Sequence, residues 1–68
     1  MTITVNGERT ELPGGATVAA LIARLDLPAA GRGIAVAVDR EVVPRTEWER
    51  HALGEGDRVE VLRAIQGG

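Results

Sequence analysis

Several residue types that carry chemistry or bind nucleic acid are missing or scarce in this sequence of 68 residues. There is no cysteine, which excludes disulfides, thiolate metal sites and thiol nucleophiles together. All 8 basic residues are arginine, so no lysine can serve a phosphate-binding loop, form a Schiff base or link one copy to another. Trp48 is the only aromatic residue and the net charge is −2, which excludes the basic, stacking surface typical of nucleic-acid binding.

Long hydrophobic stretches are also absent. The longest apolar runs, 18–23 and 34–38, are far shorter than the ~20 residues that span a bilayer. The first five residues lack the basic start and apolar stretch of a signal peptide. Because 44% of the residues are hydrophobic, the composition is that of one small globular domain, which we expect to act in the cytoplasm without a membrane partner.

Strand patterns occupy both ends and the middle of the chain. Residues 2–5 alternate polar and apolar, Asn6-Gly7 has the composition of a tight hairpin turn, and 8–12 returns as a polar edge strand. The run 34–38 is apolar throughout and indicates an interior strand. Further strands are predicted at 41–43, after the two-residue turn Asp39-Arg40, and at 58–64.

One amphipathic helix is predicted between the hairpin and the apolar strand. Thr17 is a plausible N-cap, because a threonine hydroxyl can accept a hydrogen bond from a free backbone N–H in the first turn. Apolar residues follow at helical spacing: Val18, Leu21, Ile22 and Leu25. Pro28 ends the helix at 26–27, giving about 9 residues. The spacing of Thr46 and Glu49 predicts a second, single helical turn with a capping box.

This order of elements predicts an α+β fold, with one main helix packed on one face of a four- to five-stranded mixed sheet. The strand residues expected to face Leu21, Ile22 and Leu25 are Ile3, Val5, Val36, Val59 and Val61. The opposite face is expected to carry Thr4, Ala35, Ala37 and Leu62. Because these side chains are small or apolar, we interpret that face either as an ordinary small-residue surface or as a flat docking face for a partner.

The chain after the last predicted strand reads Ile65-Gln66-Gly67-Gly68. We expect a folded domain over 1–64 and a flexible tail over 65–68. Glycine has no side chain, so nothing widens the tail beside the carboxylate of Gly68. Four extended residues reach roughly 13 Å, which suits insertion of that carboxylate into a narrow slot of another protein.

Taken together, these features resemble a known family. The hairpin–helix–strand order, the turn 53–57 into the last strand and the terminal glycines resemble the ubiquitin-like β-grasp sulfur carriers. Among these, the similarity is greatest to the ThiS family of thiamine biosynthesis, and it covers the whole chain. It is carried by Val5-Asn6-Gly7-Glu8, Val36-Ala37-Val38-Asp39, Val43-Pro44-Arg45 and Ala64-Ile65-Gln66-Gly67-Gly68.

The resemblance implies a carrier rather than an enzyme, with no catalytic residue, metal or cofactor bound by the chain itself. A ThiF-like adenylyltransferase would use ATP and magnesium to activate the Gly68 carboxylate. A sulfur donor would convert the adenylate to a thiocarboxylate, and a ThiG-like thiazole synthase would take the sulfur. In this scheme Ile65, Gln66 and Gly67 enter the partner, while Gly68 is modified covalently.

Other functions fit the same residues. A carrier could supply sulfur for molybdopterin or another metabolite instead. A protein modifier would join its C-terminus to other proteins, and a plain interaction module would not need the terminal glycines. His51 is the only histidine, and without neighbouring ligands we interpret it as a surface residue rather than a metal or catalytic group. Trp48 is interpreted as part of the core.

Overall fold

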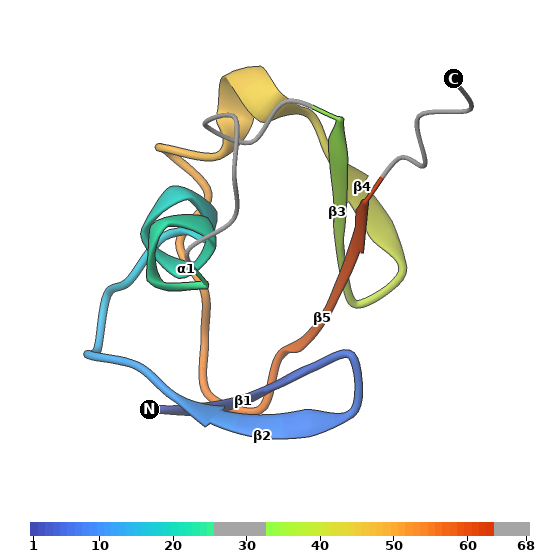
Figure 1. Cartoon of the computed structure of the whole chain (residues 1–68). Coiled ribbons are helices and arrows are strands. Elements are labelled where there is room, and N and C mark those ends of the chain that lie inside the picture. Colours follow the sequence, from blue (N-terminus) through green and yellow to red (C-terminus); the bar gives the residue numbers. More distant parts are fainter. Residues whose placement is uncertain (26–32, 64–68) are drawn as a thin grey trace.

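Five strands and one α-helix form the part of the chain that the computed structural model describes, residues 1–25 and 33–63 (Figure 1). A short 3-10 helix, η2, follows the fourth strand. In chain order the elements are β1 (Thr2–Val5), β2 (Glu8–Glu11), α1 (Val18–Arg24), β3 (Ile34–Val38), β4 (Glu41–Val43), η2 (Arg45–Glu47) and β5 (Arg58–Arg63).

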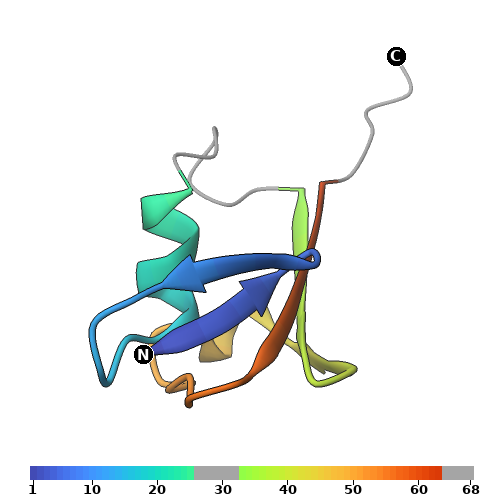
Figure 2. The same cartoon turned by 90° about the horizontal axis from the view of Figure 1, so that it is seen from below.

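The strands form a single sheet in the order β2-β1-β5-β3-β4. β5 pairs in parallel with β1 and antiparallel with β3, and each outer strand pairs antiparallel with its hairpin neighbour. Figures 1 and 2 show α1 on one side of this sheet. The prediction of a mixed sheet with one main helix is therefore confirmed, and the last strand of the chain lies at its centre.

Both predicted two-residue turns have left-handed backbone at their two central positions. Asn6 and Gly7 have φ of 51° and 85°, and Asp39 and Arg40 have φ of 51° and 72°. Such angles match the type I′ turn, whose twist suits an antiparallel hairpin. Each turn therefore reverses the chain, so that the strand after it pairs antiparallel with the strand before it.

The core lies between the sheet and α1. All five strand residues predicted to face the helix are buried, Leu21 and Ile22 are buried with them, and Leu25 is partly buried against the cluster. Trp48 is 5% exposed, which confirms it as a core residue, and its indole Nε1 donates to the Val43 carbonyl at 2.9 Å. The buried set is Ile3, Val5, Leu12, Val18, Leu21, Ile22, Val36, Val38, Val43, Trp48, Leu53, Val59 and Val61.

The predicted N-cap is confirmed for α1 but not for η2. Thr17 caps α1, because its hydroxyl accepts from the Ala20 N–H at 3.2 Å. The predicted stop at 26–28 lies outside the described residues. The capping box at Thr46 is wrong: η2 is capped at Pro44 without a side-chain bond, since the Glu47 N–H already reaches the Pro44 carbonyl at 2.8 Å. Of the described helices, none has the length and apolar character needed to cross a membrane.

Candidate functional site

The strand that leads to the predicted site is the central strand of the sheet. Ile65, Gln66, Gly67 and Gly68 lie outside the described residues, and Arg63 ends β5. Along this strand Val59 and Val61 are buried beneath the helix, whereas the alternate residues are exposed. The sheet therefore holds the beginning of β5 between β1 and β3, whereas its end at Arg63 pairs with β3.

Asn6 contacts β5 through both its backbone and its side chain. Its N–H donates to the Val59 carbonyl at 2.9 Å, at the point where β1 stops pairing. Two residues further along β5, its side-chain Nδ2 donates to the Val61 carbonyl at 3.1 Å, and its Oδ1 accepts from the Val61 N–H at 2.9 Å. The amide of one side chain thus satisfies both backbone groups of Val61, as a neighbouring strand would.

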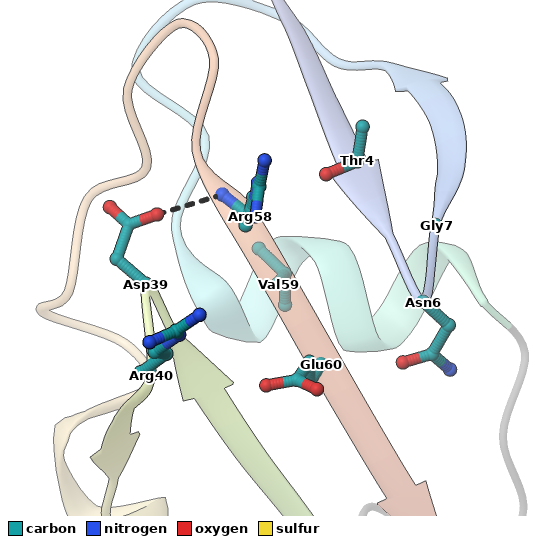
Figure 3. Close-up of a pocket in the computed structure, with 8 residues that line it drawn as sticks. All are labelled: Thr4, Asn6, Gly7, Asp39, Arg40, Arg58, Val59 and Glu60. Carbon is teal, nitrogen blue, oxygen red and sulfur yellow. Dashed lines mark hydrogen bonds between the residues drawn. The ribbon is translucent and has the colours of Figure 1, made fainter.

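Asp39 makes a similar contact at the other end of β5. Its N–H donates to the Arg58 carbonyl at 2.7 Å, and its Oδ1 accepts from the Arg58 N–H at 3.0 Å. Figure 3 shows Asp39 and Asn6 on opposite sides of the strand, each coming from the first position of a hairpin turn. Two turn residues therefore hold the central strand, Asp39 at its first residue and Asn6 at Val61.

The sheet face opposite α1 carries a strip of apolar side chains. Ala35 pairs with Leu62 and Ala37 pairs with Val42, so the four side chains share this face. Leu62 is 66% exposed and Val42 is 75% exposed, although both are large and hydrophobic. We call Ala35, Ala37, Val42 and Leu62 the apolar strip. Three of these were predicted from sequence; Val42 was missed, because two adjacent valines do not reveal which one faces outward.

Thr4 lies on the same face but away from the apolar strip. It pairs with Arg58, at the opposite end of β5 from Leu62. Here the face is hollowed into an open depression of about 720 Å³ (Figure 3). Its lining is largely polar and consists of Thr4, Asn6, Gly7, Asp39, Arg40, Arg58, Val59 and Glu60. The outer face is thus apolar near the end of β5 and charged near its beginning.

The remaining sequence candidates do not form a second site. His51 is half-buried, and its carbonyl accepts from the Val18 N–H at 3.0 Å. Within residues 1–25 and 33–63, no group of acidic, histidine or cysteine side chains has the arrangement of a metal site. Glu47 pairs with Arg50 at 3.0 Å on the surface, which accounts for that carboxylate.

Comparison with known protein families and curated sequences gives a consistent result. The model of the ThiS family matches residues 3–68. The sulfur carrier protein ThiS of Escherichia coli (strain K12) is 34% identical over 68 residues, which is the full length of both chains. A thiazole synthase of Paramagnetospirillum magneticum is 32% identical over the whole of this chain, which spans 20% of that longer protein.

Solved structures show the same fold. The crystal structure of a thiamine biosynthesis protein (ThiS) from Geobacter metallireducens has a TM-score of 0.80 and 30% identity, with both chains fully covered. The solution structure of a thiamine biosynthesis protein from the same organism has a TM-score of 0.79 at 30% identity, and 88% of that chain is covered. The predicted β-grasp arrangement is therefore confirmed.

Proposed function

Because this chain belongs to the ThiS family, we propose that it carries sulfur for the thiazole of thiamine as a thiocarboxylate on Gly68. The observation that carries the proposal is the match to a sulfur carrier protein over the full length of both chains. Such a protein is a carrier and not a catalyst. Its own fold presents the reacting group, and other proteins supply the chemistry.

The proposed chemistry begins with activation of a poor electrophile. A carboxylate resists attack by sulfur because its oxygen is a poor leaving group, so a ThiF-like adenylyltransferase would use ATP and magnesium to form an acyl-adenylate. A sulfur nucleophile from a donor would then displace AMP and leave the thiocarboxylate. Gly67 and Gly68 would admit the chain to the partner's site, and Ile65 and Gln66 would be gripped there. The need for ATP supports a cytoplasmic location.

A thiazole synthase is the proposed acceptor of the sulfur. One thiazole synthase contains a region similar to this whole chain within its own sequence. A carrier-like region joined to a synthase keeps donor and acceptor at high effective concentration, as expected of two proteins that act in succession. This supports a partnership between the present chain and a ThiG-like synthase.

The apolar strip is the proposed docking face for the adenylating partner, extending toward Thr4 along the same face. We expect Leu62→Glu to weaken binding to that partner by at least about tenfold, because a buried, unpaired charge would replace an apolar contact. Isothermal titration calorimetry measures the affinity. The melting temperature should change little, since Leu62 is 66% exposed.

Arg24→Gln is the matched control for this variant, since it also makes the net charge more negative by one, and Arg24 is exposed on α1, away from the strip. It should bind the partner with nearly wild-type affinity. Equal affinities for Leu62→Glu and the wild type would show that the partner docks elsewhere.

Intact mass spectrometry of the protein from its native cells tests the proposed function directly. We expect a fraction of the chain to be heavier by the mass difference between one sulfur and one oxygen, with the change confined to the C-terminal peptide. Deleting the gene for the adenylyltransferase should remove this species. High-mass conjugates with other proteins, in place of the sulfur-bearing chain, would instead indicate a protein modifier.

A further inference from the structure

We propose that Asn6 is a positioning residue for the reaction at Gly68, acting through β5. This inference rests on the proposed function and assigns a task to a residue far from the C-terminus in sequence. Asn6 lies 55 residues before Val61, yet its side chain binds both backbone groups of that residue.

The need for such a residue follows from where β1 ends. The parallel pairing of β1 with β5 covers only Thr4 with Arg58 and Val5 with Val59. The chain then turns back at Asn6-Gly7, so β1 supplies no backbone beyond Val59. The antiparallel neighbour β3 continues along the other side of β5 as far as Arg63. From Val61 onward, β5 would therefore have a strand on one side alone.

The Asn6 amide replaces the missing strand at this point. Its Oδ1 and Nδ2 are arranged as the carbonyl and N–H of a strand would be, and they bond to Val61 at 2.9 Å and 3.1 Å. Asn6 can do this because it occupies a left-handed turn position, with φ of 51°, which directs its short side chain toward β5. With Asn6 on one side and β3 on the other, β5 is hydrogen-bonded on both sides as far as Val61.

The position of β5 matters for the C-terminal group. Gly68 is five residues beyond Arg63, a span of up to roughly 17 Å, so a small change in the direction of the strand end displaces the carboxylate considerably. Adenylation requires that carboxylate to meet ATP in a defined geometry, and misplacement by about 1 Å can lower a rate 100-fold. Fixing Val61 therefore narrows the directions in which the chain leaves the domain.

The matched pair of variants Asn6→Gly and Asp39→Gly tests the proposal. Both residues occupy the first position of a turn with φ of 51°, which glycine accepts readily. Each variant loses its side-chain bonds to β5 and keeps its backbone bond, at Val59 and Arg58 respectively. The two variants differ in which residue of β5 they release, Val61 or Arg58, so they separate positioning of the tail from a general loss of stability.

With the full-length protein and its adenylating partner, we expect Asn6→Gly to lower kcat for adenylation by about tenfold and leave KM within about twofold of the wild-type value. The apolar strip, which supplies the proposed contact with the partner, is unchanged in this variant, so KM is spared. Asp39→Gly should leave both constants within about twofold. Asn6→Asp keeps the size and the acceptor for the Val61 N–H but sets an oxygen against the Val61 carbonyl, so it should also lower kcat.

Amide hydrogen exchange provides a readout that does not depend on the partner. The Val61 amide, whose N–H loses its acceptor on Asn6, should exchange at least about tenfold faster in Asn6→Gly after correction for global stability, and its exchange should be unchanged in Asp39→Gly. Wild-type kcat in Asn6→Gly, or an equal loss in Asp39→Gly, would overturn the positioning role. If even the wild type is not adenylated, the proposed function fails. Unaltered exchange of the Val61 amide in Asn6→Gly would overturn the inference separately.

Discussion

One alanine appended after Gly68 is expected to reduce adenylation at least about 100-fold, the largest effect on activity that we predict. An extra residue carries the carboxylate roughly 3.5 Å further along the chain, so it can no longer lie beside ATP when the domain is docked. Pyrophosphate exchange with the adenylating partner measures the loss. Affinity for the partner should be retained, because the apolar strip is unchanged.

Gly68→Ala provides the companion measurement for the extended chain. It keeps the length and adds one methyl group beside the carboxylate, so we expect a smaller reduction, about tenfold. A chain lengthened by one residue that is adenylated at the normal rate would refute the idea that the terminal carboxylate is the reacting group. A large loss in Gly68→Ala with none in the extended chain would refute it equally.

Leu21→Ala is expected to have the largest effect on stability. Leu21 is 0% exposed and lies at the contact between α1 and the sheet, so its truncation leaves a cavity that costs about 3 to 5 kcal/mol. A domain of this length has a free energy of unfolding of roughly 3 to 10 kcal/mol. The variant should therefore lose about a third or more of its free energy of unfolding, and a larger fraction of its molecules should be unfolded in the absence of denaturant.

Urea denaturation followed by the fluorescence of Trp48 measures this loss, since that side chain is buried in the folded state. Leu62→Ala is the control, because a leucine that is 66% exposed should contribute less than about 0.5 kcal/mol. Ordinary substitutions lower the free energy of unfolding by about 1 kcal/mol. A loss no larger than this ~1 kcal/mol in Leu21→Ala would contradict the described core.

Local patterns in the sequence predicted most of the elements correctly. The hairpin turns at Asn6-Gly7 and Asp39-Arg40 follow from residues that accept left-handed backbone, and the alternation in 2–5 and 58–63 marks which side chains are buried. The helix stripe Val18, Leu21 and Ile22 follows from spacing alone. These features depend on neighbouring residues, which is why they can be predicted without knowledge of the fold.

Features that depend on pairing between distant strands could not be predicted in the same way. The exposure of Val42 is decided by its place opposite Ala37, and the bonds from Asn6 to Val61 join residues 55 positions apart. The capping box at Thr46 failed because Pro44 had already started the turn. The predicted roles of Ile65, Gln66, Gly67 and Gly68 lie outside the described residues and stay predictions.

The central place of β5 also bears on how a nascent chain acquires its structure. The two hairpins, β1–β2 and β3–β4, are joined in the sheet only through β5, which is made after all the other strands. A ribosome-bound chain that stops short of residue 58 holds two separate ribbons, each too small to be stable in water. The complete sheet can therefore form only after the last strand has been translated, so an unfinished chain has no folded domain with which to act as a sulfur carrier.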